Sequence, residues 1–444
     1  MPENHEKRLK RQVHGKFHRF TAIVPLGFEA TLVKELRQIG ISTENGSFET
    51  DDGKVFFTAK ITEAWKAVAH SRIANRLLMD IASFKAENFR ELEKKATEIP
   101  WELYLPQDAP LQIHVTCKHS RLYHSDAVAE RFYDVIKGGS LPLATASAFT
   151  SCVIASEAKQ SQSSFFAKAS ATPSAGTPRN APTQNLYVSL LDDRCTVSLD
   201  LAGEELYKRG HKRFVNDAPL KETIAAAMLF EAFEQVQSPT TLIDPMAGSG
   251  TFSLEAAYMA SGLIPGKCRD FALKHQPAFK EVTWNYIVNS SLRGNEVTVA
   301  ITSPIHKILT SDITNKAVDI IKHNVEASPL PEGCISPQKR DFFSYTSDEI
   351  AKLRGESQAV IVLNPPYGKR LDANAPKLYA DIGKKLTELA QGAESPLTVA
   401  ILAPKGACTE NLLKNCVALG LASTKLIKTS HGGISLNCFV GKIF

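Results

Sequence analysis

The second half of the chain alternates short apolar runs with stretches of helical spacing. Apolar residues that recur every three or four positions predict helices, whereas a short apolar run between polar turns predicts a buried strand. Strands are expected at 241–243, 307–312, 359–363 and 397–402, and helices at 252–261, 315–327 and 409–419. A hairpin of 424–428 and 437–440 follows, turning at His431-Gly432-Gly433. With one further unit at Arg340, the pattern predicts an α/β fold, a doubly wound mixed sheet of seven strands closed by an antiparallel hairpin.

The front half consists of shorter units that mix strands and helices. We expect a first unit with strands at 22–24, 46–50 and 53–58 and helices at 28–39 and 62–68. A second unit has a strand at 111–117, a helix at 125–137 and a hairpin of 186–191 with 196–201. Its helix is apolar on one face and stops at Gly138-Gly139. This half is therefore expected to be an α+β region.

A length of 444 residues favours two or three domains. We place them at 21–85, 86–202 and 203–444, behind a basic tail at 1–20 that is expected to be disordered. Residues 141–183 break the pattern with 18 Ala and Ser among 43 residues and four prolines. A structureless segment of that length inside a compact domain predicts a disordered insert. Part of it, residues 152–161, resembles peptides encoded by mobile palindromic repeats within bacterial genes.

Asn364-Pro365-Pro366-Tyr367 follows the predicted strand at 359–363. Proline fixes φ and donates no N–H, so the Asn364 amide and the Pro365 carbonyl are left without partners in a sheet. Two such acceptors can hold the two hydrogens of an exocyclic amine on a nucleobase and tilt its lone pair out of the ring plane. The tetrapeptide is also an ordinary turn, so the motif alone leaves both interpretations open.

Residues 244–251 form a glycine-rich turn between a strand and a helix. Gly248 and Gly250 let the backbone approach a ligand, and the N-terminus of the helix offers free N–H groups. The dinucleotide motif G-x-G-x-x-G is absent, because Ser253 occupies the third glycine position and Glu255 lies too early for a ribose-binding acid. The P-loop motif is absent too, because no Lys follows the second glycine. A purely structural turn remains the alternative.

Acidic residues end two further predicted strands. Asp312 could bind the vicinal hydroxyls of a ribose. Asp341 could accept a hydrogen bond from an adenine amine, with Phe342 packed on the ring. A single acid at a strand end is most often only solvated, but four strand ends that carry a glycine-rich turn, two acids and Asn-Pro-Pro-Tyr favour a nucleotide-binding enzyme.

This combination resembles the class I S-adenosylmethionine-dependent methyltransferases that act on amino groups. The resemblance implies S-adenosyl-L-methionine as the cofactor, with Asp312 on its ribose and Asp341 and Phe342 on its adenine. Its methionine part would lie on Asp244, Pro245, Ala247, Gly248, Ser249, Gly250 and Thr251. The catalytic residues that hold the target base would be Asn364, Pro365, Pro366 and Tyr367. Ala247 stands where many relatives have Cys.

The front half, with the runs 200–210 and 218–223, resembles the THUMP-containing RNA methyltransferases, and most of all the ribosomal RNA large subunit methyltransferase L family. The resemblance spans most of 21–444 and implies a ferredoxin-like unit at 21–85 and a THUMP domain at 86–202. It also implies a structured RNA partner and methylation of a guanine N2 in 23S rRNA. The candidate RNA-binding residues are Lys208, Arg209, His211, Lys212 and Arg213, a basic cluster that suits a phosphate backbone but could also be a solvated surface.

Composition adds mainly exclusions. The net charge of +5 is modest, and no apolar stretch approaches the roughly 20 residues of a membrane span. The first 20 residues lack the apolar core of a secretion signal, so the cytoplasm is the expected location. Eight cysteines never form C-x-x-C, so we expect reduced thiols and no metal. The oligomeric state is left open.

Other functions fit the same residues. A guanosine of transfer RNA is one alternative target, and adenine N6 of a nucleic acid is another, because Asn-Pro-Pro-Tyr can hold either amine. A third alternative is an RNA-binding or assembly protein without catalytic activity, in which the glycine-rich turn is the remnant of a cofactor pocket.

Deletion of residues 145–182 should leave the thermal unfolding midpoint and the methyl transfer activity unchanged, because a low-complexity insert of this kind buries little apolar surface. Thermal denaturation and tritium transfer from labelled S-adenosylmethionine to total RNA would measure both. Lost folding or lost activity would contradict the prediction.

Overall fold

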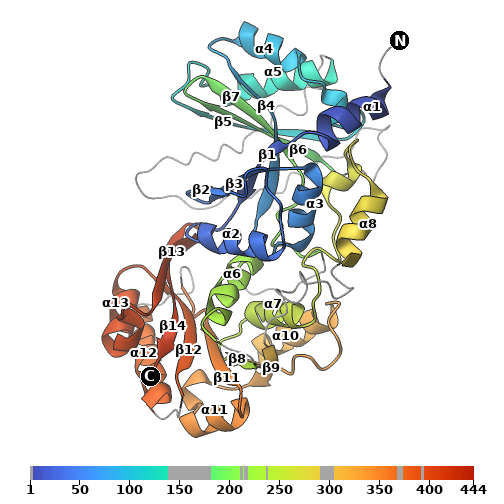
Figure 1. Ribbon diagram of the computed structural model, residues 1–444. Coiled ribbons are helices and arrows are strands. Elements are labelled where there is room, and N and C mark those ends of the chain that lie inside the picture. Colours follow the sequence, from blue (N-terminus) through green and yellow to red (C-terminus); the bar gives the residue numbers. More distant parts are fainter. Residues whose placement is uncertain are drawn as a thin grey trace.

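The computed structural model (Figure 1) describes residues 4–138, 182–210, 214, 219–236, 239–290, 305–367, 374–391 and 395–444. These residues form two seven-stranded sheets, with strand orders β2-β3-β1-β4-β7-β6-β5 and β10-β9-β8-β11-β12-β14-β13. In Figure 1 the first sheet occupies the blue to green upper part and the second the green to red lower part. The α/β fold with a seven-stranded catalytic sheet and an α+β front region is thereby confirmed.

The two front units share one sheet. The first unit contributes β1 (His18–Ile23), α2 (Glu29–Gln38), β2 (Glu49–Asp51), β3 (Lys54–Ala59), α3 (Ile61–His70) and β4 (Arg76–Lys85). The second contributes α4 (Phe89–Thr97), β5 (Leu111–Lys118), α5 (Ser125–Lys137), β6 (Gln184–Leu191) and β7 (Arg194–Asp200). The strand β4 pairs antiparallel with β1 on one side and with β7 on the other. The boundary near residue 85 therefore separates two sequence units that are continuous in the sheet.

The expectation of a disordered tail at 1–20 is wrong for most of that segment. The structure has α1 (His5–Leu9) and a π-helical turn at Lys10–His14, and β1 begins at His18. Val13 is fully buried, and the His18 ring forms a 2.8 Å hydrogen bond with its carbonyl oxygen. Together with the ion pair of Arg8 and Glu102 (2.6 Å), this burial orders a segment whose composition is mainly basic and polar. The predicted insert at 141–183 lies outside the described residues, apart from its last two positions.

The second sheet carries the glycine-rich turn and the Asn-Pro-Pro-Tyr motif. Its elements, with the helices between them, are α6 (Glu222–Phe233), β8 (Thr240–Asp244), α7 (Thr251–Ala260), α8 (Glu281–Ser290), β9 (Ile305–Asp312), α10 (Asn315–Glu326), β10 (Gln338–Lys339), α11 (Ser347–Arg354), β11 (Gln358–Leu363), α12 (Ala375–Gln391), β12 (Leu397–Pro404), α13 (Ala407–Asn415), β13 (Lys425–His431) and β14 (Ile434–Ile443). Neighbouring strands from β10 to β12 are parallel. β11 from Ala359 onward and all of β12 are buried, and both are mostly apolar because helices cover both faces of a parallel sheet.

The closing hairpin restores the strand direction at the far edge. β14 is antiparallel to both β12 and β13. Two reversals make β13 parallel to β11, so β8, β9, β11 and β13 all end at the same edge of the sheet. The residues that follow these four strands therefore lie along the same edge of the sheet.

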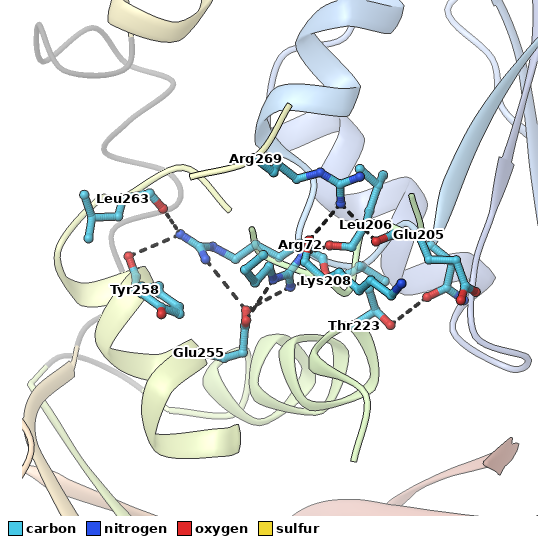
Figure 2. A network of polar contacts seen from close by, with 12 residues as sticks. Arg72, Glu205, Leu206, Lys208, Thr223, Glu255, Tyr258, Leu263 and Arg269 are labelled. Atoms are coloured by element: carbon cyan, nitrogen blue, oxygen red, sulfur yellow. Dashed lines mark hydrogen bonds and ion pairs between the residues drawn. The ribbon is translucent and has the colours of Figure 1, made fainter. Parts of the chain in front are cut away.

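A buried ion network joins the front half to α7 (Figure 2). Glu255 of α7 accepts hydrogen bonds of 2.9 and 3.0 Å from Nε and Nη2 of Arg209, and it lies 3.7 Å from Nη1 of Arg72. Arg72 also donates to the carbonyls of Tyr258 and Leu263, and Arg209 donates to the carbonyl of Arg72. The side chains of Glu255 and both arginines are at most 4% exposed. The front half is thereby fixed to the helix that begins at the glycine-rich turn.

Further contacts extend this interface to the outer edge of the second sheet. Glu231 of α6 accepts a 2.5 Å hydrogen bond from Thr31 of α2 and pairs with Lys425 of β13 at 2.6 Å. Gly27, just before α2, lies so close to β13 that a Cβ atom would be 2.2 Å from the Lys428 carbonyl oxygen. Its φ of 84° also favours glycine. α2 and its preceding turn are therefore seated directly against the edge strand, as Figure 1 shows.

Glu255→Gln should lower the free energy of unfolding by about 3–5 kcal/mol, because two buried guanidinium groups lose their carboxylate. Urea denaturation of the full chain would measure the change. Glu234→Gln is the matched control, since it removes a more exposed ion pair with Lys34 (2.5 Å) across the same interface. That control should cost less than about 1 kcal/mol. Equal losses in the two variants would contradict a special role for the buried network.

Candidate active site

The glycine-rich turn begins at the carboxyl end of β8 and leads directly into α7. Gly248 and Gly250 have φ values of 58° and 80°, a region that side chains disfavour. A Cβ on Gly250 would lie 3.1 Å from Ile321 of α10, whereas a Cβ on Gly248 would meet nothing within 4 Å. Gly248 thus presents its backbone to open space. The remaining predicted cofactor residues of the turn are buried, so the turn offers backbone groups rather than side chains: Pro245, Ala247, Ser249 and Thr251.

Asp244 ends β8 and is fully buried. Its Oδ2 accepts hydrogen bonds from Ser253 Oγ (2.7 Å) and Ser253 N (3.3 Å), while its Oδ1 has no hydrogen-bond partner among the described residues. Burial raises the pKa of Asp244 to about 7, against the opposing effect of Ser253 and with a smaller upward contribution from the charge of Asp312. A buried, unpartnered carboxylate oxygen of this kind suits a cationic ligand group.

Asp312 ends β9 and connects the glycine-rich turn to α10. One carboxylate oxygen accepts from Gly248 N at 3.0 Å, and the other accepts from Thr314 N and Oγ1, each at 3.0 Å. Thr314 in turn caps α10 by accepting from Ala317 N. Asp312 is half-buried, so one side of it remains accessible beside the turn.

Asp341 lies beyond β10, one strand further out than Asp312. It accepts a 3.0 Å hydrogen bond from Phe343 N and so begins a short 3-10 helix at Phe342–Ser344. Phe342 is 2% exposed and packs in the core, whereas the neighbouring Phe343 is 37% exposed. A role for Phe342 against an adenine ring stays a prediction, and the structure gives its ring apolar protein neighbours.

Asn364-Pro365-Pro366-Tyr367 follows β11, which pairs with β8 on one side and with β12 on the other. Asn364 Oδ1 is buried and has no hydrogen-bond partner among the described residues. Pro365 is buried and Pro366 exposed. Tyr367 Oη lies 3.0 Å from Nδ1 of His431, the last residue of β13. From the sequence, His431 was predicted only to be part of a turn. Its position beside Tyr367 depends on the order of the strands in the sheet.

The predicted RNA-binding cluster separates into three parts. Lys208 is exposed and pairs with Glu204 at 3.2 Å, so it stays a candidate. Arg209 is buried in its bidentate contact with Glu255, and its assignment to a phosphate backbone is therefore corrected. His211, Lys212 and Arg213 lie outside the described residues.

Asn324 is a residue that the sequence analysis missed. It is fully buried on α10, where it accepts from Phe214 N (2.7 Å) and donates to the carbonyls of Phe214 (2.8 Å) and Ser249 (3.0 Å). It thereby ties the backbone of Phe214 to that of Ser249 in the glycine-rich turn. A signal was present, because Ala317, Ile321 and Asn324 share one helix face, and a polar residue on an apolar face is informative.

The described residues contain neither a candidate metal-binding cluster nor a helix that could span a membrane. No group of three or more His, Cys, Asp and Glu residues there could hold a metal ion. None of the helices there is long and apolar enough to span a membrane.

Two family models match the chain. Residues 209–419 match the model described as "RMKL-like, methyltransferase domain", and residues 19–78 match the "RlmL ferredoxin-like domain". The second half is thus a methyltransferase domain, with a ferredoxin-like domain in front of it. Residues 209–419 are thus similar to the RMKL-like methyltransferase domain and residues 19–78 to the RlmL ferredoxin-like domain, which confirms the resemblance seen in the sequence.

Curated relatives are similar to the chain over most of its length. The chain is 28% identical over 385 residues to the "Ribosomal RNA large subunit methyltransferase K/L" of Allochromatium vinosum, covering 84% of this chain and 46% of that protein. It is 27% identical over 377 residues to the "Putative RNA methyltransferase YpsC" of Bacillus subtilis, covering 84% of this chain and 86% of that protein. The chain therefore spans about half the length of the K/L relatives and most of the length of YpsC.

The solved structure of "SMU.472, a putative methyltransferase complexed with SAH" has the same fold. It matches with a TM-score of 0.70 and 24% identity over 96% of this chain and 98% of that one. Both halves of the molecule therefore have counterparts in a single solved chain.

Asp244→Asn should gain stability relative to the wild type as the pH rises from about 4 to about 7. In that window the wild-type carboxyl is ionised when unfolded but protonated when folded, so unfolding is favoured by about 1.4 kcal/mol per pH unit. Asparagine removes this effect. Urea denaturation at pH 5 and pH 8 would measure the difference, and parallel losses at both pH values would contradict it.

Proposed function

We propose that this chain transfers a methyl group from S-adenosyl-L-methionine to the exocyclic N2 amine of a guanosine in 23S ribosomal RNA. The observation that carries the proposal is the buried Oδ1 of Asn364, which has no partner among the described residues and follows the strand next to the glycine-rich turn. β11 and β8 are paired in parallel, with Ile361 opposite Ile243, so Asn364 and Asp244 follow adjacent strands at one edge. An acceptor for an amine and a nucleotide-binding turn thus lie side by side.

The residues around the turn fit the cofactor. Its methionine ammonium group would pair with the free Oδ1 of Asp244, which favours the ionised carboxylate. Gly248 leaves open space at its backbone, Asp312 would accept from the ribose hydroxyls, and Asp341 would accept from the adenine amine. The similarity to a protein solved with SAH supports this assignment. When bound, S-adenosylmethionine supplies an electrophilic methyl group on a positively charged sulfur.

The chemistry assigned to the motif is positioning of the target amine. Asn364 Oδ1 and the Pro365 carbonyl would accept its two hydrogens and turn its lone pair out of the ring plane towards the methyl group. As the N–C bond forms, the S–C bond breaks with its electron pair left on sulfur, and the amine proton passes to water. Tyr367 would hold the base, which must leave its stack to reach the site. Most of the rate would come from this orientation.

The front half would deliver the RNA. Its ferredoxin-like domain matches that of RlmL, and the relatives named above are described as ribosomal RNA and RNA methyltransferases. The buried network at Glu255 would hold this half in a constant position over the catalytic edge. A THUMP domain at 86–202, RNA contacts at Lys208 and a cytoplasmic location complete the proposal.

Tritium from labelled S-adenosylmethionine should enter the large ribosomal RNA when the purified chain acts on total RNA from a strain that lacks this gene. Nucleoside analysis of the labelled fraction should give N2-methylguanosine. Label in transfer RNA, or N6-methyladenosine as the labelled nucleoside, would overturn the stated target while keeping the methyltransferase. Total RNA that stays unlabelled would overturn the proposed function.

Asn364→Ala should lower turnover about 100-fold or more, because the acceptor acts on charge that develops in the transition state. Binding of S-adenosylmethionine, measured by calorimetry, should be unchanged. The matched control is Asn411→Ala, since Asn411 is half-buried on α13 and donates a 2.8 Å hydrogen bond to the Ala407 carbonyl of its own helix. Wild-type turnover in the Asn364 variant would refute the assignment of Asn364.

A further inference from the structure

We infer that His431 is a positioning residue of the target-base site, which fixes the ring of Tyr367 through its hydroxyl group. This inference rests on the function proposed above. It extends the site from the Asn-Pro-Pro-Tyr motif to the closing hairpin, which follows it by more than 60 residues in the chain.

The strand order brings His431 to the site. Because β14 is antiparallel to both β12 and β13, β13 runs in the direction of β11 and ends at the edge where the motif begins. His431 pairs with Ile434 across Gly432 and Gly433, whose φ values are 58° and 80°. A two-residue turn with both φ values positive fixes the register of a hairpin. A slip by one residue would turn His431 to the other face.

The hairpin turn itself faces open space. A Cβ atom on Gly432 or Gly433 would meet no other atom within 4 Å. The turn is thus shaped by its two glycines rather than by packing against the protein.

The contact between the two rings has well-defined geometry. Tyr367 Oη lies 3.0 Å from His431 Nδ1, and the ring centroids are 6.1 Å apart with the planes at 84°. A tyrosine ring turns about two side-chain torsions. A hydrogen bond at Oη restricts the first directly, because it holds the end of the ring axis, and it favours one setting of the second, because a phenolic O–H prefers the plane of its ring. A hydroxyl can donate to Nδ1 or accept from it, so the contact is compatible with either tautomer of the histidine.

The consequence concerns orientation. A base that packs against Tyr367 inherits the angle of that ring, and the angle decides whether the amine meets Asn364 Oδ1 and the methyl group in line. Loss of one hydrogen bond of this kind should reduce kcat about threefold to tenfold. Binding of S-adenosylmethionine should not change, because neither ring belongs to the glycine-rich turn.

Kinetics on a bacterial 23S rRNA transcript would test the inference through a double-mutant cycle of His431→Ala and Tyr367→Phe. Each single variant should lose about threefold to tenfold in kcat, and the double variant should lose no more than Tyr367→Phe alone. His431→Asn keeps a polar atom near the Nδ1 position and should retain more activity than His431→Gln, which moves that atom outward. Ser430→Ala, an exposed neighbour on β13, is the matched control and should keep wild-type kcat.

The outcomes separate the two proposals. If the wild type methylates the transcript but His431→Ala keeps full kcat, the inference is overturned and the proposed function stands. Additive losses in the double variant would likewise overturn it, because His431 would then act independently of Tyr367. If the wild type transfers no methyl group to the transcript while binding S-adenosylmethionine in calorimetry, the RNA target of the proposed function fails, and the inference fails with it.

Discussion

The carboxylate of Glu255 is the point on which the arrangement of this molecule depends. A charge buried that deeply is tolerated only with partners, and Glu255 has two guanidinium groups, one from each side of the domain junction. Glu255 lies two residues after Ser253, which binds Asp244, and four after Thr251, where α7 begins. The first turn of α7 therefore contacts Asp244 through Ser253 and the front half through Glu255. A shift of the front half would move the start of α7.

Much of the fold could be predicted from periodicity alone. The helix expected at 125–137 has those bounds in the structure, and the catalytic strands agree within one to three residues at most of their ends. These elements have strong patterns of apolar residues because the protein covers each of them on one face or on both. The order at residues 5–20 could not be predicted, because it depends on contacts with distant parts of the chain: Val13 and Phe20 lie in the core, and Arg8 pairs with Glu102. The basic composition of the segment gives no sign of these contacts.

The candidate site was predictable where chemistry is local and unpredictable where it depends on distant partners. Asp244, Asp312 and Asn364 lie at one edge of the sheet because parallel strands end together, a rule that needs only the order of elements. Arg209 looked like its basic neighbours, yet Glu255 buries it. Glu255 itself was considered only as a ribose-binding acid, and no sequence spacing indicates that Arg72 lies opposite. The place of His431 in the site could not be predicted without knowing that β14 lies between β12 and β13.

The close approach of Gly27 to Lys428 has a consequence for whether the catalytic half could be stable without the front half. β13 is the edge strand of the catalytic sheet, and an edge strand with free backbone groups is a template for association with another chain. α2 and the turn before it lie against that strand. A catalytic half without its front half would expose this part of the edge and the buried charge of Glu231 together. The front half therefore also shields this edge of its catalytic neighbour, and the two halves are poor candidates for exchange as independent modules.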